Sequence, residues 1–260
     1  MLLKLALSAF LVAAVPAWAW GPEGHEIVAA MALKELTPAA RTQVAALLGS
    51  ESMMIHESNW ADEIRDQQPE TGPWHYVDIP LAASGYDAAR DCPADNCVVA
   101  QIERARRVLG DQNAGGDRRR DALRFLIHFV ADVHQPLHAE DNHDHGGNQL
   151  HVEFGADRTS LHHIWDTQVV KALGNGEESI ADALDRGVSP QQRKAWEAGT
   201  PADWANQAHT IARDMIYPVM GGNNHVRLPL NYAHLAEPLT RLQLSCAGVR
   251  LAWVLNTTLK

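Results

Sequence analysis

Apolar residues recur every three or four positions along most of the chain, which is the spacing of amphipathic helices. Residues 24–36, for example, are apolar at positions 27, 28, 31, 32 and 36, and Thr37-Pro38 then offers a typical helix start. Pro136 marks the end of another such segment. The pattern predicts helices over residues 24–36, 38–48, 98–109, 118–135, 161–173, 190–198, 202–217 and 235–255.

Strand-like alternation of apolar and polar residues is confined to two short segments, residues 74–79 and 149–154. The sequence contains no internal repeat, and no Ser/Gly-rich linker divides it. We therefore expect a mainly α protein that folds as a single domain with one or two short β-strands.

The first residues have the features of an export signal. Lys4 precedes an apolar run over residues 5–15, and Ala17-Trp18-Ala19 then forms a small-x-small motif for cleavage between Ala19 and Trp20. An apolar run of this length is too short to cross a bilayer, and no later stretch approaches the ~20 apolar residues of a membrane span. The sequence predicts that residues 1–19 are removed as a signal peptide and that the protein is secreted or periplasmic.

Export places the three cysteines in an oxidising compartment. Cys92 and Cys97 are separated by four residues that include a proline and an asparagine, so the short loop can close into a local disulfide. Cys246 lies in an apolar helical pattern and is expected to be a buried free thiol.

Composition and charge narrow the range of possible functions. With 46% hydrophobic and 21% charged residues, the 260-residue chain is neither a disordered tail nor a fibre. Its net charge of −10 leaves no broad basic surface for phosphates, although the predicted helix over 98–109 has a basic face. A protein of this charge that acts on nucleic acid must take positive charge from elsewhere. The 14 histidines, against 22 Lys and Arg, direct attention to metal ions.

Two histidine–aspartate pairs have helical spacing. His128 and Asp132 are four residues apart on one predicted helix, and His162 and Asp166 repeat that spacing on another. Asp132 lies on a strongly apolar helix, where an unpaired carboxylate would be costly, so it needs a partner such as a cation. His138 follows the helix-ending proline and can point back toward the same region.

Further candidate ligands lie in other segments. Asp62 lies in NWADEIR, and His75 begins the predicted strand WHYVDI. Cleavage before Trp20 would free an α-amine, which with the Trp20 carbonyl oxygen could chelate a metal ion, and His25 follows about one helical turn later.

Each of these features also has an ordinary structural interpretation. A single histidine–aspartate pair is commonly a helix hydrogen bond, and Asp62 beside Arg65 could be a solvated ion pair. The combination is more specific, because histidines and aspartates without cysteine suit zinc in a hydrolytic site. We expect His143 and His145 to lie in a solvated loop. The remaining histidines are expected to be structural or on the surface: His56, His134, His151, His163, His209, His225 and His234.

The chain resembles the secreted three-zinc nucleases of fungi, plants and bacteria, the S-one/P-one nuclease family, which share a helical fold with the zinc phospholipases C. The resemblance runs through WGPEGH, WADEIR, WHYVDI, DCPADNC, RFLIHFVADVHQPLH, GGNQLHV, LHHIWDT and GVRLAWVLN, and it covers residues 20–260. It implies one nuclease domain that binds three Zn²⁺ ions. The implied ligand sets are Asp62, His75, His128 and Asp132; Trp20, His25 and the shared Asp132; and His138, His162 and Asp166.

The resemblance also implies an activity. The expected enzyme is a monomeric endonuclease that uses zinc-activated hydroxide to cleave P–O3′ bonds of single-stranded DNA and RNA, leaving 5′-nucleotides, and that removes 3′-phosphates from mononucleotides. Asp78 would orient or activate the attacking water, and Arg65 would neutralise phosphate charge. Asn148 would contact substrate, although a turn before a strand explains this residue equally well. Stable duplex binding and membrane insertion are not expected.

Two other functions remain open from the residues alone. A zinc phospholipase C would share the metals, but His25 lies only five residues after Trp20, and Asp166 stands where that branch would have Glu. A non-enzymatic zinc-binding protein of the cell envelope would also be exported and histidine-rich. Hydrolysis of single-stranded RNA rather than phosphatidylcholine would exclude the first, and turnover of phosphodiesters would exclude the second.

Overall fold

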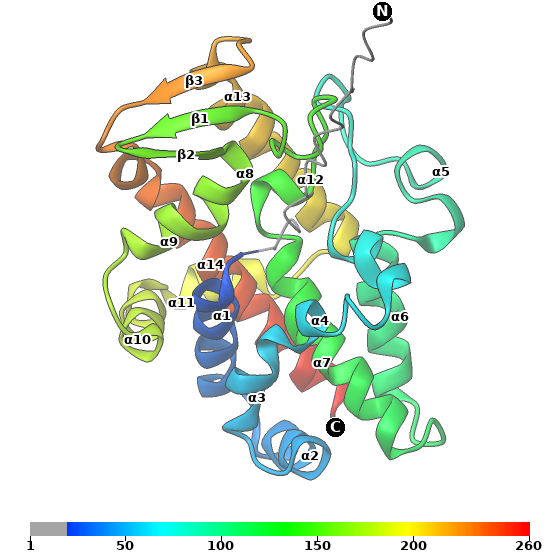
Figure 1. Ribbon diagram of the computed structural model, residues 1–260. Helices are drawn as coiled ribbons and strands as arrows, with labels where there is room; N and C mark the ends of the chain where they lie inside the picture. Colours follow the sequence, from blue (N-terminus) through cyan, green and yellow to red (C-terminus); the bar gives the residue numbers. More distant parts are fainter. Residues whose placement is uncertain (1–19) are drawn as a thin grey trace, which may run out of the picture.

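The computed structural model describes residues 20–260, and the predicted export peptide lies outside the described residues. Helices dominate the chain, as predicted (Figure 1). The longer ones are α1 (Pro22–Lys34), α2 (Pro38–Leu48), α6 (Val98–Gly110), α7 (Gly116–Asp132), α10 (Glu177–Gly187), α11 (Pro190–Trp196), α12 (Pro201–Ile211) and α14 (Tyr232–Thr258).

Short helical turns connect these helices and supply much of the site. They are α3 (Met53–His56), η1 (Glu57–Asn59), α4 (Trp60–Glu63), η2 (Pro69–His75), α5 (Ala88–Asp91), η3 (Pro93–Asp95), η4 (Pro136–His138), α8 (Leu161–His163), η5 (Ile164–Gln168), α9 (Val169–Lys171), η6 (Ala212–Ile216) and α13 (Tyr217–Met220). The elements α8, η5 and α9 follow one another without a break, so the helix predicted over 161–173 is present, with a π-helical turn inside it.

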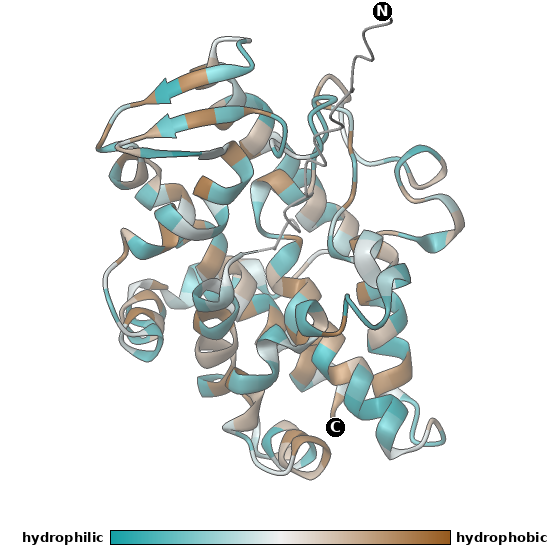
Figure 2. Cartoon of the chain, in the orientation of Figure 1, coloured by the Kyte–Doolittle hydropathy of each residue, from teal (hydrophilic) through white to brown (hydrophobic). Residues whose placement is uncertain are grey.

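The hydrophobic core lies between α1, α7 and α14, which contact one another in the middle of the molecule (Figure 1). Brown apolar residues alternate with teal polar ones along α6 and α7, as expected of helices with one buried face (Figure 2). The buried residues of α7 extend from Leu123 to Asp132 with few interruptions, so its C-terminal half lies deep in the protein. Its last turn therefore places His128 and Asp132 away from water.

A small sheet with strand order β2-β1-β3 lies at the edge of the helical body. β1 (His151–Phe154) pairs antiparallel with β2 (Asp157–Ser160) and parallel with β3 (His225–Leu228). The prediction of one or two short strands found β1 and missed the other two. β2 and β3 are four residues each and rich in polar side chains, so they lack the apolar alternation that identifies a strand.

The prediction of a strand over residues 74–79 is wrong. Trp74 and His75 end η2, and the residues after them run extended without forming a ladder. The alternation itself is real, because Val77 and Ile79 are buried while Tyr76 and Asp78 are exposed. The extended segment instead pairs with the loop after η4, where the Asp141 amide donates to the Ile79 carbonyl at 2.8 Å.

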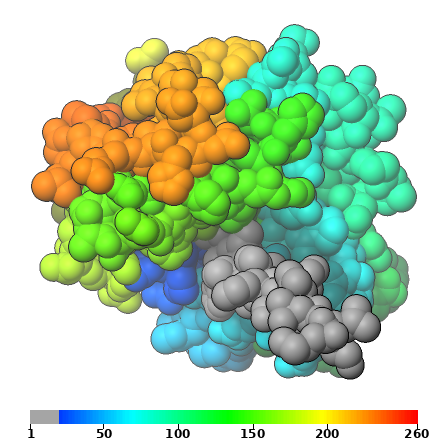
Figure 3. All heavy atoms as spheres, turned by 45° about the horizontal axis from the view of Figure 1, so that its top comes forward, coloured from blue at the N-terminus to red at the C-terminus, as the bar shows by residue number. Residues whose placement is uncertain are grey.

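That pairing brings two distant parts of the chain together. The space-filling view shows green atoms, at the middle of the sequence, between the orange region of β3 and α13 and the cyan region (Figure 3). The Val77 amide also donates to the His138 carbonyl at 2.8 Å, which ties the extended segment to η4. Within residues 20–260, each helix is too short or too polar to cross a lipid bilayer.

Candidate metal centre

The structure brings the predicted histidine and aspartate ligands together from separate elements. Three groups of side chains place their ligand atoms within 4.8 Å of one another, which is close enough for each group to hold a metal ion. The groups are His75, His128 and Asp132; His25, Asp62 and His128; and His138, His162 and Asp166. Their assignment as ligands stays a prediction, but their convergence is a property of the fold.

The first group lies where α7 meets η2. Asp132 Oδ2 is 3.0 Å from His75 Nδ1 and 3.3 Å from His128 Nε2, and all three side chains are almost completely buried. The two histidine nitrogens are 3.1 Å apart. The i,i+4 spacing on α7 thus places His128 and Asp132 around one point, as the helical geometry predicts.

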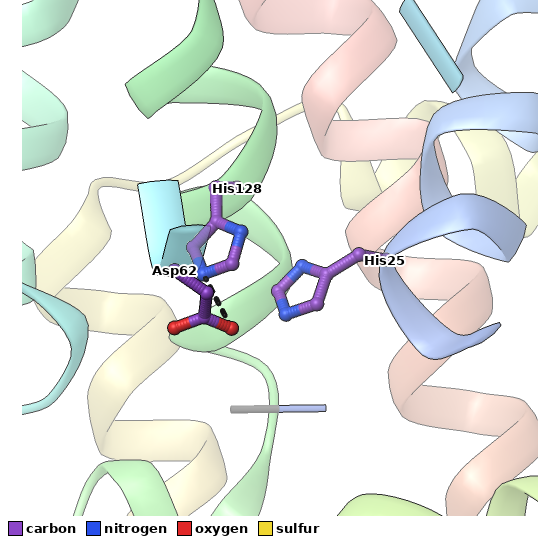
Figure 4. A group of neighbouring side chains, drawn as sticks. All are labelled: His25, Asp62 and His128. Atoms are coloured by element: carbon purple, nitrogen blue, oxygen red, sulfur yellow. Dashed lines mark ion pairs between the residues drawn. The ribbon is translucent and has the colours of Figure 1, made fainter. Parts of the chain in front are cut away.

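The second group joins α1 and α4 to this point (Figure 4). The His25 ring stacks on the His128 ring with centroids 3.8 Å apart, and Asp62 Oδ2 is 3.7 Å from His128 Nε2. On the other side, His25 Nε2 is 3.5 Å from Asp132 Oδ1. The two oxygens of Asp132 therefore face different histidines, which is the arrangement that a carboxylate shared by two cations requires.

The third group lies beside the first. His138 Nε2 and His162 Nε2 are 3.2 Å apart, and His162 Nε2 is 3.3 Å from Asp166 Oδ2. The other oxygen of Asp166 accepts a hydrogen bond from the Gln135 side-chain amide at 2.8 Å. Pro136 turns the chain directly after α7, so that His138 on η4 points back toward Asp132 Oδ1 at 4.0 Å.

Backbone carbonyls fix the histidine tautomers. Nδ1 of His128 donates to the Ser58 carbonyl at 2.7 Å, and Nδ1 of His138 donates to the His75 carbonyl at 2.9 Å. Nδ1 of His162 donates to the Gly146 carbonyl at 2.6 Å. A carbonyl only accepts, so each Nδ1 carries the proton and each Nε2 presents a lone pair toward the group. This outer hydrogen bond is usual for histidines that bind metal.

The donor set fits divalent cations. In the third group, two unprotonated Nε2 atoms face each other at 3.2 Å, where their lone pairs repel unless a cation lies between them. Nε2 of His25 and Oδ1 of Asp132, which are 3.5 Å apart, are both buried without a hydrogen-bond partner. Such buried polar atoms are costly when unpaired, so the fold leaves ligand atoms for ions to satisfy.

Burial also shifts the protonation of these groups. It lowers the pKa of His25, His75 and His138 well below the usual range of histidine, so that these rings are neutral. It raises the pKa of Asp132 and Asp166 well above the usual range of aspartate. A metal ion needs neutral imidazoles and ionised carboxylates, and its positive charge would itself restore the ionised form of these aspartates.

Trp20 is held against the site. Its indole is fully buried, and Nε1 donates to the Ala131 carbonyl on α7 at 3.1 Å. The next amide, of Gly21, donates to the Asp166 carbonyl at 2.7 Å. Gly24 lets the chain fold this closely, because a Cβ there would lie 2.7 Å from the Trp20 Cβ. The Trp20 indole thus lies against the helix that carries His128 and Asp132, and the peptide that follows it contacts Asp166. Ligation by the Trp20 amine stays a prediction.

An open pocket adjoins the groups and contains the three predicted residues that are not ligands. Arg65, Asp78 and Asn148 line it together with three of the candidate ligand histidines. Arg65 also contacts Asp62 at 3.3 Å. The Asn148 side chain donates to the His145 carbonyl at 2.8 Å, so the turn role considered for it is present, and its substrate role stays a prediction.

Asp78 is exposed in this pocket, yet desolvation by the surrounding protein and the neighbouring Asp141 raise the pKa of its carboxyl to about 6. Sequence reasoning missed the other lining residues, Tyr76, Leu137, His145 and Gly146. Tyr76 could have been found, because the alternation over 74–79 places it on the same side as Asp78. His145 lies in an exposed loop, as expected, but it also faces the pocket.

Gly146 illustrates what sequence spacing does not reveal. Its φ is +63°, and a Cβ there would lie 2.5 Å from the Leu137 carbonyl oxygen. The glycine thus lets its own carbonyl approach and orient His162, which no spacing rule predicts.

Two predictions outside the site are confirmed. Cys92 and Cys97 form a disulfide, and Cys246 is a buried free thiol. Among the histidines expected to be structural, His134 is fully buried and donates to the Val130 carbonyl at 2.7 Å, while Arg250 contacts its other ring nitrogen.

Comparison with known proteins identifies the family of this chain. The model of the S1/P1 nuclease family matches residues 20–260. Endonuclease 2 of Arabidopsis thaliana is 30% identical over 91% of this chain and 89% of its own length. Nuclease S1 of Aspergillus oryzae is 27% identical over 94% and 93%, and nuclease P1 of Penicillium citrinum is 28% identical over 90% and 96%. The chain belongs to the S1/P1 nuclease family.

Proposed function

We propose that this protein is a zinc-dependent nuclease that hydrolyses phosphodiester bonds of single-stranded DNA and RNA. The observation that carries the proposal is the pair of unprotonated Nε2 atoms of His138 and His162, which face each other at 3.2 Å beside an open pocket. Such a pair calls for a cation, and the pocket gives a substrate access to it. Family membership and the names of the relatives support nucleic acid as the substrate.

Three zinc ions account for the donor atoms. Asp62, His75, His128 and Asp132 would hold one ion, and His25 with the Trp20 amine and carbonyl would hold a second that shares Asp132. His138, His162 and Asp166 would hold the third. When bound, such ions supply Lewis acidity and an activated water at neutral pH. Nitrogen and carboxylate donors without cysteine favour zinc in an open, hydrolytic site over a closed structural one.

The side chains of the pocket have defined tasks in this proposal. The Arg65 guanidinium, at the pocket wall, offers positive charge to a phosphate oxygen. Asp78 holds or accepts the proton of the attacking water, for which a pKa near 6 is suitable because the carboxylate is available at neutral pH. Asn148 contacts the substrate by its side chain, once released from its own loop.

Charge and shape explain a preference for single strands. The positive charge of three ions would be concentrated in the pocket, while the chain as a whole carries a net charge of −10. Tyr76 is 37% exposed at the pocket, so it offers a ring on which an unpaired base can stack. A duplex keeps its bases stacked inside and cannot use this ring, so its binding should be weak.

The finer features of the proposal come from the family resemblance. They are cleavage of the P–O3′ bond to leave 5′-nucleotides, removal of 3′-phosphates from mononucleotides, and action as a monomer. Secretion to the periplasm or the medium, after cleavage between Ala19 and Trp20, is part of the same proposal. It is supported by the family match, which starts at residue 20, and by the burial of Trp20 against α7.

The test compares single-stranded and duplex oligonucleotides of the same sequence. The processed protein should cleave the single strand into products with 5′-phosphates, lose activity with a chelator and regain it with zinc. Undiminished cleavage after exhaustive chelation would refute the metal role, and equal cleavage of duplex and single strand would refute the strand preference.

A further inference from the structure

A second pocket opens beside the chain segment that carries His75. Aromatic side chains line it, together with two arginines from α6 and α7, and we call it the Trp74 pocket: Trp74, Phe125, Phe129, Arg104 and Arg118. It shares no lining residue with the pocket at the metal centre. Arg104, which belongs to the basic face predicted on the helix over 98–109, thus lines a concave site.

The aromatic wall of this pocket is held in place. The Trp74 ring packs at an angle of 67° against the Phe125 ring, with centroids 5.6 Å apart, and Phe125 stacks on Phe129 at 5.1 Å. The Trp74 indole also donates to the Asn96 side chain at 2.9 Å. Trp74 and Phe125 are both only partly buried, so the wall presents a fixed ring surface to solvent.

The positive charge of the two pocket arginines is available to a ligand. Arg104 lies over the Trp74 ring at 5.8 Å, and both Arg104 and Arg118 are exposed. Within residues 20–260, neither one forms an ion pair, whereas the acid of the pocket, Asp121, is paired with Arg124 at 3.4 Å. Seven of the 22 Lys and Arg residues of the chain fall between residues 104 and 124. Two of these seven, Arg104 and Arg118, line the Trp74 pocket and give it positive charge.

We propose that the Trp74 pocket binds a second nucleotide of the single strand whose scissile phosphate lies at the metal centre. The base would stack on one ring of the aromatic wall, Trp74 or Phe125, and Arg104 and Arg118 would each contact a backbone phosphate of the strand. Stacking surfaces beside cationic groups are how proteins hold single strands without reading their sequence. The inference rests on the proposed function, because it takes single-stranded nucleic acid as the substrate.

The two pockets are close enough for one strand to occupy both. Trp74 lines one and Tyr76 lines the other, and their Cα atoms are at most about 7 Å apart along the chain. A strand of a few nucleotides can therefore reach across this segment. A small phosphodiester is too short to reach both pockets, so the Trp74 pocket should strengthen the binding of oligonucleotides but not of small phosphodiesters.

The test uses the double variant Arg104→Ala/Arg118→Ala. Its matched control is Arg158→Ala/Arg227→Ala, which removes the same charge from exposed residues of the small sheet. Binding is measured by fluorescence anisotropy with a labelled, hydrolysis-resistant phosphorothioate oligothymidylate of ten nucleotides. Hydrolysis of bis(p-nitrophenyl) phosphate reports whether the metal centre is intact.

The Arg104/Arg118 variant should bind the oligonucleotide at least about fivefold more weakly, with a salt dependence reduced by about 1.4 in logarithmic slope for two lost phosphate contacts. Its turnover of the small phosphodiester should equal that of the wild type, and the control variant should bind like the wild type. Unchanged oligonucleotide binding, an equal loss in the control, or an equal loss on the small substrate would overturn the inference. Failure of the wild type to cleave single-stranded DNA would instead refute the proposed function, and the binding result would still decide the role of the Trp74 pocket.

Discussion

Replacing Asp132 by asparagine should remove two metal ions together. Asp132 is fully buried, with one carboxylate oxygen 3.0 Å from His75 and 3.3 Å from His128, and the other 3.5 Å from His25. The two oxygens thus face different histidines, and in the proposed ligand sets each oxygen would serve a different ion. Asparagine keeps the shape of the side chain but removes the negative charge that both ions share.

The size of the effect follows from mass action. An ion that binds only the folded protein, at a free concentration a hundred times its Kd, stabilises it by about 2.7 kcal/mol. Two lost ions therefore cost about 5 kcal/mol, or ~10–20 °C in Tm for a chain of this size. Without metal, burial raises the pKa of Asp132 so that the acid is protonated, and the neutral asparagine should then change the free energy of unfolding by only about 1 kcal/mol.

The assay combines metal analysis after dialysis with thermal melts at fixed free zinc and with chelator. The matched control is Asp166→Asn, because Asp166 belongs to the third group alone and should cost one ion and about 2.7 kcal/mol. Equal losses in the two variants, or three ions retained by Asp132→Asn, would refute the shared role of Asp132.

Three other substitutions test the pocket. Desolvation raises the pKa of Asp78 to about 6, and bound cations favour its carboxylate form, so activity should rise with pH through a midpoint at or below about 6. Asp78→Asn should lower kcat and flatten this limb of the pH profile. An unchanged pH profile would contradict the proposed proton role of Asp78. Arg65→Ala should keep the full metal content but lower kcat/KM by about tenfold or more, so loss of metal would instead indicate a structural role. Gly146→Ala forces a Cβ toward the Leu137 carbonyl at a positive φ and should deplete the third metal position, which metal analysis against wild type would detect.

The helical part of the fold could be predicted because it depends on local periodicity. The segment of α7 is apolar on one face and ends near a proline, and the structure places its end at Asp132, three residues before the predicted end. β2 and β3 could not be predicted, because each is stabilised by pairing with β1 rather than by its own side chains. Residues 76–79 alternate between exposed and buried side chains as a strand does, but they pair with a loop instead of another strand.

The same distinction holds for the site. Helical spacing alone places His128 near Asp132 and His162 near Asp166, because both members of each pair lie on one helix. The stacking of His25 on His128 depends on how α1 packs against α7, which no local pattern contains. The carbonyls that orient the histidines are equally hidden, since every residue has one and only the fold selects it.

The central claim is that clustered divalent ions occupy the three groups of histidines and aspartates. Anomalous scattering at the zinc absorption edge, from crystals of the processed protein grown with zinc, tests it directly. We predict three peaks, with one on each side of the Asp132 carboxylate and one among His138, His162 and Asp166. Ordered zinc found only elsewhere on the protein, with the His138 and His162 nitrogens still facing each other across an empty gap, would contradict the account.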